Sequence, residues 1–133
     1  MQEKWTYWIP IKDLYFNYLL DSLIDSDVLK IAVNEINNRH SLLITFKYSS
    51  GAYQITNDNG HFQKTQNNNK NADWAFFKIN NSNFLKFLSE YSDTISDTIP
   101  FMHFVILTQG YQLDILSPQE PEIKIIQRKL NAK

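Results

Sequence analysis

The 133-residue chain contains no cysteine and only three glycines. Without cysteine, neither a disulfide framework nor a thiolate metal ligand or nucleophile is possible. The sequence also has no glycine-rich phosphate loop, no HExxH metal motif and no nucleophile elbow around any serine. These absences argue against an enzyme, so we expect no catalytic residue, no bound metal and no cofactor.

Long apolar runs are absent as well. No window approaches the roughly 20 apolar residues of a membrane-spanning helix, and the N-terminus lacks the features of a signal peptide. We therefore expect a cytoplasmic protein that does not contact a membrane. Hydrophobic residues make up 43% of the chain, ample for one core. The sequence predicts a single domain over residues 1–133, with a flexible loop at 66–73 and a basic tail at 128–133.

The formal net charge of -1 argues against nucleic acid as the main ligand. Acidic residues nevertheless gather in two stretches without Lys or Arg, residues 13–29 and 87–123. The acids in these stretches are Asp13, Asp21, Asp25, Asp27, Glu90, Asp93, Asp97, Asp114, Glu120 and Glu122. Solvated surface is the ordinary interpretation of such runs, and a docking face for a basic partner is the alternative.

Residues 101–116 predict a β-hairpin, because a run of strand-favouring residues is followed by Gln109-Gly110 and then an alternating run. The expected cross-strand pairs are Thr108 with Tyr111, Ile106 with Leu113, and Phe104 with Ile115. One face should be core, since it carries only Met102, Phe104, Ile106, Tyr111, Leu113 and Ile115. The other face mixes apolar residues with His103, Gln112 and Asp114. It is either covered by a second layer or open to a partner.

The remaining pattern predicts two helices and several further strands. Apolar residues recur at helical spacing over 14–24 and again over 84–91. A short strand or aromatic strap is expected at 5–9, a meander over 29–33, 42–48 and 53–55, and further strands at 74–79 and 122–127. The prediction is an α+β fold in which two helices pack on a mostly antiparallel sheet of five to seven strands.

His103 and Asp114 share the mixed face of the hairpin, diagonally across the ladder, so the carboxylate could orient and charge the imidazole. A structural pair is the favoured interpretation, because structural pairs also perturb pKa values. His40 and His61 fall in a predicted turn and loop, where a solvated role is expected.

Residues 74–92, WAFFKINNSNFLKFLSEYS, and 103–123, HFVILTQGYQLDILSPQEPEI, resemble the C-terminal half of small immunity proteins. Such proteins are encoded beside polymorphic or contact-dependent growth-inhibition toxins. The similar parts are a strand-helix unit, an acidic loop and a hairpin whose first strand carries His and whose second ends in Asp-Ile-Leu before a proline. The resemblance covers about residues 74–125. It implies an inhibitor that binds a toxin domain, often a nuclease, and blocks its active site.

We therefore expect a toxin-neutralising protein, a monomer or weak dimer, whose partner is a cognate basic toxin domain. Carboxylates at the contact would occupy the positions of phosphates in a nuclease channel. The expected contact residues are Asp21, Asp25, Asp27, Glu90, Asp93, Asp97, His103 and Asp114. Two other classes stay open: a phage-type anti-defence inhibitor and, with less support, a small hydrolase that uses His103 with Asp114.

Overall fold

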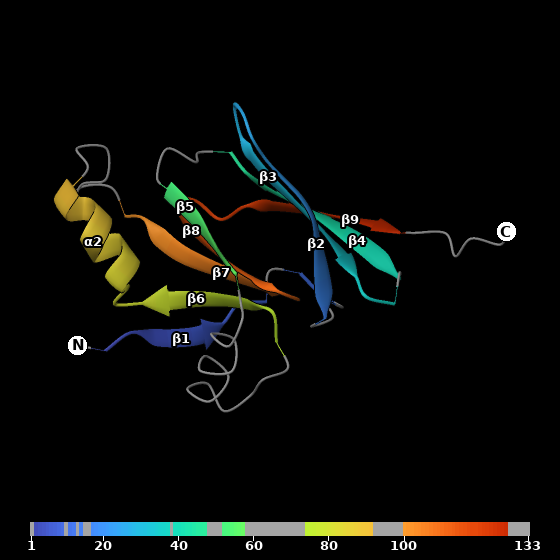
Figure 1. Cartoon of the computed structure of the whole chain (residues 1–133), viewed down its shortest axis with the longest axis horizontal. Coiled ribbons are helices and arrows are strands. Elements are labelled where there is room, and N and C mark those ends of the chain that lie inside the picture. Colours follow the sequence, from blue (N-terminus) through green and yellow to red (C-terminus); the bar gives the residue numbers. More distant parts are fainter. Residues whose placement is uncertain are drawn as a thin grey trace, which may run out of the picture.

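The computed structural model describes residues 2–9, 11–12, 14, 17–37, 39–47, 52–57, 74–91 and 100–127. These residues form two antiparallel sheets that pack face to face (Figure 1). The five-stranded sheet has the order β1 (Lys4–Tyr7), β6 (Phe76–Asn80), β7 (Met102–Thr108), β8 (Tyr111–Ser117), β5 (Ala52–Asn57). The four-stranded sheet has the order β2 (Tyr18–Asp25), β3 (Leu29–Glu35), β4 (His40–Phe46), β9 (Glu122–Gln127). The predicted loop at 66–73 and tail at 128–133 lie outside the described residues.

The predicted α+β fold with two helices is wrong. Strands dominate the described part of the chain, and α2 (Asn83–Tyr91) is the one helix found there. Its bounds confirm the helix predicted at 84–91. No helix among the described residues is long and apolar enough to cross a membrane.

β2 spans residues 18–25, so residues 18–24 of the helix predicted over 14–24 form a strand instead. The reason is a β-bulge between Leu20 and Ser22, which adds one residue to the strand. Leu20 and Leu23 lie opposite the buried Val33 and Ile31, so both point toward the core. The bulge thus turns the period-two spacing of a strand into a spacing of three, which is also typical of a helix.

The hairpin of β7 and β8 has the predicted register. Its pairs include Thr108↔Tyr111, Ile106↔Leu113 and Phe104↔Ile115. Gly110 has a φ of 87°, a backbone conformation that glycine adopts without a clash from Cβ. The core face is confirmed for the four central side chains, Phe104, Ile106, Leu113 and Ile115, whereas Tyr111 is 40% exposed.

The predicted meander is only partly correct. β3 and β4 pair as expected, but β5 pairs with β8 in the five-stranded sheet. β4 instead has β9 as its second neighbour, with Ile123 opposite Ile44 and Ile125 opposite Leu42. Residues 122–127 are therefore an edge strand, as predicted. Because β9 occupies the second edge of β4, β5 does not pair with β4 and belongs to the other sheet.

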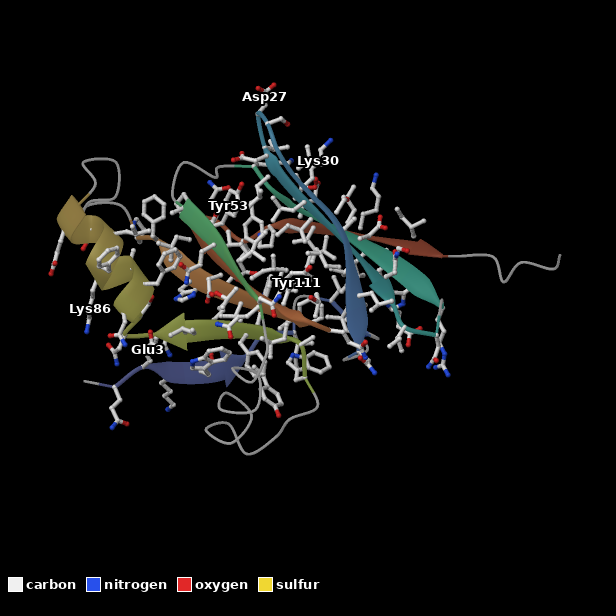
Figure 2. The ribbon with its side chains drawn as sticks, viewed as in Figure 1. Glu3, Asp27, Lys30, Tyr53, Lys86 and Tyr111 are labelled. Carbon is white, nitrogen blue, oxygen red and sulfur yellow. The ribbon has the colours of Figure 1, made fainter. Side chains whose placement is uncertain are left out.

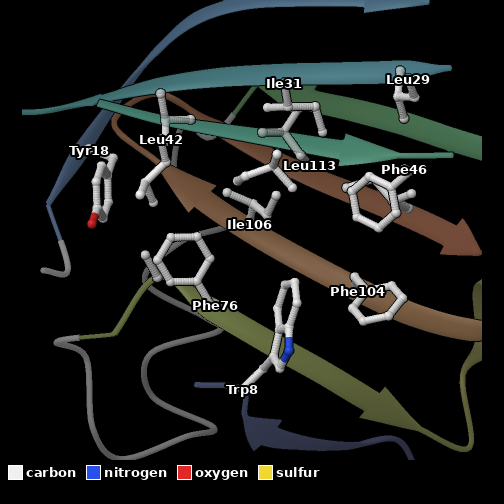
Figure 3. Packing of buried hydrophobic residues seen from close by; sticks show 14 residues of the cluster. Trp8, Tyr18, Leu29, Ile31, Leu42, Phe46, Phe76, Phe104, Ile106 and Leu113 are labelled. Carbon is white, nitrogen blue, oxygen red and sulfur yellow. The ribbon is translucent and has the colours of Figure 1, made fainter. Parts of the chain in front are cut away.

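The main core lies between the two sheets (Figure 3). Alternate residues of β3 and β4 are buried, as expected for strands with one covered face. Aromatic rings from opposite sheets meet there: the centroids of Phe46 and Phe104 are 5.4 Å apart, and those of Tyr18 and Phe76 are 5.5 Å apart. Fully burying each such phenylalanine contributes about 1.5–3 kcal/mol to folding.

A polar pair lies at one end of this core. The Tyr18 hydroxyl lies 2.9 Å from Nε2 of His40, and both residues are buried. Burial lowers the pKa of His40 below its ordinary value of 6.5, although the nearby Glu35 carboxylate acts in the opposite direction. The folded protein therefore favours a neutral His40.

This shift makes the stability depend on pH. Because the pKa of His40 is lower in the folded state, the unfolded chain takes up the proton first as the pH falls below 6.5. The free energy of unfolding should then fall by at most about 1.4 kcal/mol per pH unit through this residue. Urea unfolding of wild type and His40→Gln from about pH 7.5 to about pH 5.5 measures this dependence. We expect the free energy of unfolding to fall more steeply with decreasing pH in wild type than in His40→Gln. Equal slopes would contradict the assignment.

Candidate functional site

The structure separates the acids that were expected to share one surface. Asp21, Asp25 and Asp27 are exposed and lie together on β2 and the turn to β3. Glu90 is exposed on α2, which packs on the far side of the five-stranded sheet (Figure 1). Asp93 and Asp97 lie outside the described residues.

His103 and Asp114 are only 4% and 3% exposed, and they form the pair that the sequence predicted. His103 Nε2 lies 2.7 Å from Asp114 Oδ1, and His103 Nδ1 lies 2.6 Å from Ser82 Oγ. The Ser82 oxygen also accepts a hydrogen bond of 2.9 Å from the backbone N–H of Leu85. Both ring nitrogens of His103 therefore have a hydrogen-bond partner, Asp114 at Nε2 and Ser82 at Nδ1.

Ser82 was not singled out from the sequence, although its position one residue before the helix is typical of an N-cap. Serine, histidine and aspartate are also the residue types of a nucleophilic triad. Here Ser82 is 4% exposed and its oxygen is engaged by the helix. The N–H of Asn83, where a triad would need an oxyanion donor, donates to Glu3 Oε2 at 2.7 Å. These bonds fasten α2 to the sheet.

A cavity of about 200 Å³ lies beside this chain of bonds and has Ser82 and His103 in its wall. It is smaller than the roughly 300–1,000 Å³ of small-molecule sites. Nor does any group of three or more His, Asp or Glu side chains in the described ranges have an arrangement that would hold a metal ion.

The mixed face of the hairpin is covered. α2 packs Phe84, Leu85 and Leu88 against Phe101 and Leu116. Farther along the same face, Trp5 and Trp74 pack against the cluster of Phe77, Ile79, Val105 and Leu107. Of the two alternatives that the sequence left open, the second layer is correct for these residues, and His103 and Asp114 are not available to a partner.

Apolar side chains are exposed where the five-stranded sheet ends at β5. Tyr53 and Ile55 lie opposite Ile115 and Leu113, so they point to the core-facing side of the sheet. Leu113 and Ile115 are 1% exposed, yet Tyr53 is 36% exposed and Ile55 is 43% exposed. The four-stranded sheet thus covers β8 and leaves this side of β5 open.

Strand β2 borders the same opening. At one end of β2, Tyr18 O accepts a hydrogen bond of 2.9 Å from Gln109 N, in the turn between β7 and β8. At the other end, Asp25 lies close enough to the Tyr53 hydroxyl to raise its pKa. β2 belongs to the other sheet and does not pair with β5. Its two ends lie near the turn between β7 and β8 and near Tyr53 of β5, the latter labelled in Figure 2.

We call this surface the open side and define it by Asp21, Asp25, Asp27, Tyr53, Ile55 and Tyr111. Figure 2 shows Tyr53 below the hairpin tip that carries Asp27, with Tyr111 farther from the tip. Partial burial, then the charge and hydrogen bond of Asp25, raise the pKa of Tyr53, so its hydroxyl stays protonated. Lys30, opposite Ile24 in β3, is a base close to these acids. The sequence predicted the acids of the open side, but not the aromatic residues beside them.

The bond chain through Ser82 makes a prediction about stability. Ser82→Ala removes the helix cap and leaves Nδ1 of the buried His103 unpaired, so the free energy of unfolding should fall by about 2–4 kcal/mol. Ser89→Ala, on the same helix, is the control and should change stability by less than about 0.5 kcal/mol, because its hydroxyl bonds only to Lys86 O of its own helix. Urea unfolding measures both variants.

A second measurement tests Ser82 as a nucleophile. A serine-reactive fluorophosphonate should leave Ser82 unlabelled, because the oxygen is buried and engaged by Leu85. Labelling of Ser82, or equal stability of the two alanine variants, would contradict the structural role.

No family model matches this chain, and neither a curated protein nor a solved structure does. The resemblance to immunity proteins therefore stays a prediction, and a function has to be argued from the residues described above.

Proposed function

We propose that the protein is a toxin-neutralising immunity protein that binds a cognate basic toxin domain through its open side. It acts by forming a stoichiometric complex and performs no catalysis. The observation that carries the proposal is the interaction of exposed Asp25 with exposed Tyr53, while Asp21 and Asp27 are exposed on the same strand and its turn. The sequence resemblance supplies the class of partner.

The two kinds of side chain have complementary effects on binding. Tyrosine is enriched among the residues that carry most of the energy of protein interfaces, because it buries a large ring at low entropic cost. Carboxylates attract a basic partner at long range and raise the association rate. Asp25 already interacts with the Tyr53 hydroxyl, so a carboxylate and an aromatic ring lie together before the partner arrives.

A nuclease-type toxin suits this chemistry. The Lys and Arg side chains that bind substrate phosphates also form strong charged hydrogen bonds with carboxylates. Asp21, Asp25 and Asp27 would thus take the place of phosphates in a substrate channel. A hydrolase based on His103 and Asp114 has less support, because both side chains are buried and bonded to each other.

Charge reversal on the open side should weaken this complex. Asp21→Lys with Asp27→Lys leaves Asp25 and Tyr53 unchanged and should slow association with the toxin domain encoded by the adjacent gene by about tenfold or more at low salt. Glu90→Lys with Glu122→Lys changes the net charge by the same amount on other surfaces and should have a much smaller effect. Association rates at two salt concentrations, measured by biolayer interferometry, test this, and the difference should shrink at high salt.

The outcomes separate the classes of function. Equal slowing by the two double variants would exclude the open side as the contact. No binding of the adjacent gene product would contradict the immunity proposal, and a phage operon around the gene would then favour an anti-defence inhibitor.

A further inference from the structure

The edge strands of the two sheets differ in how they are protected against pairing with other chains. Charges, bulges and prolines on an edge strand discourage such pairing. β1 carries Lys4, β2 carries its bulge and Asp25, and β9 carries Glu122 and Lys124. β5, with the sequence AYQITN, has no charge and no proline, and its register with β8 is continuous.

β5 is also accessible on its core-facing side. Tyr53 and Ile55 are exposed there, and Gln54 on the other side is exposed and uncharged. No strand in the described part of the chain pairs with the second edge of β5. A regular, uncharged and exposed edge is the feature that strand addition requires, because backbone hydrogen bonds then supply affinity and alternate side chains supply specificity.

We infer that the partner adds an extended basic segment to the edge of β5 that no strand of the described residues occupies. The added strand continues the five-stranded sheet past β5. Its alternate side chains lie over Tyr53 and Ile55, and a Lys or Arg on the same side lies within reach of Asp25. This mode of binding rests on the proposed function and specifies how the toxin domain is held.

A second copy of this chain is the other occupant that β5 could take. Antiparallel pairing of two β5 strands could place Tyr53 of each copy opposite Ile55 of the other, a favourable cross-strand pair. The acids of β2 from both copies would then lie on the same side of the joined sheet, where like charges repel. A segment with positive charge meets the same acids with attraction, so charge favours the basic partner.

A defined peptide tests the inference without the toxin. The probe is the acetylated, amidated heptapeptide Lys-Thr-Val-Thr-Val-Thr-Lys, which as a strand carries both Lys and both Val on one side. Titration of ¹⁵N-labelled protein to millimolar peptide should shift the amide signals of residues 52–57 and of Asp25. Hydrogen exchange of the amides of β5 that face away from β8 should slow at saturation. Two control peptides should cause neither the amide shifts nor the slower exchange. In the first, Glu replaces both Lys and reverses the charge; in the second, every backbone nitrogen is methylated, so that the peptide cannot pair as a strand.

Two matched variants locate the contact. Ile55→Lys should weaken peptide binding by about tenfold or more, because it puts a charged side chain on the face of β5 that the side chains of the added strand would cover. Ile126→Lys introduces the same charge at an isoleucine of similar exposure, 48% against 43%, on the edge strand β9, and should leave binding unchanged. Thermal unfolding by circular dichroism confirms that both variants fold.

The remaining outcomes overturn the inference in distinct ways. Undiminished binding of the N-methylated peptide shows simple charge attraction, and slow exchange of all β5 amides in the free protein shows an edge that is already paired. A dimer in light scattering that Ile55→Lys dissociates makes a second copy the occupant. If the toxin domain binds Ile55→Lys normally but not the Asp21→Lys, Asp27→Lys variant, strand addition fails while the proposed function stands. If the toxin domain binds no variant and not the wild type, the proposed function fails, and the peptide result alone decides whether β5 accepts a strand.

Discussion

The contact between two apolar sheet faces is the interaction on which the other features of this structure depend. Each sheet buries one side, and the rings of Phe46 and Tyr18 in one sheet meet those of Phe104 and Phe76 in the other. Neither sheet would hold its strands in water without this cover, because isolated strands bury too little apolar surface. The position of this contact determines which residues near the sheet edges are not covered by the opposite sheet, and the open side consists of such residues.

The two sheets differ in width, and this difference explains the open side. The four-stranded sheet covers the core-facing side of β7 and β8, where Phe104 and Ile106 are fully buried, but Tyr53 and Ile55 on β5 stay exposed. The opposite side of the five-stranded sheet has its own cover in α2, held by the bonds from Asp114 through His103 to Ser82. That cover hides the mixed face of the hairpin, whereas Tyr53 and Ile55 of β5 are among the exposed apolar residues that a partner can reach.

Sequence reasoning found the features that short-range patterns determine. The hairpin register followed from Gln109-Gly110 as the two loop residues between two strand-like runs, and the pairing of His103 with Asp114 followed from that register. It failed at β2, because one bulge at Asp21 gave a strand the apolar spacing of a helix. It also failed to place β5, since the choice between β4 and β8 as its neighbour depends on β9, far along the chain. The acids of the open side were found from the charge pattern alone, while Tyr53 and Ile55 beside them depend on strand pairing that the pattern does not contain.

The acids beside β5 have a consequence for selectivity as well as for affinity. An unprotected edge strand accepts many extended chains, because backbone hydrogen bonds are the same for every sequence. Asp25 lies close to Tyr53 of that strand, and Asp21 and Asp27 are exposed on the same hairpin, so their charges disfavour an acidic segment and favour a basic one. The same carboxylates disfavour pairing of β5 with its own copy. β1, β2 and β9 carry charges or a bulge of their own, whereas the charge near β5 comes from Asp25 of β2 in the other sheet. In the proposed mode of binding, this charge would select a basic segment for β5.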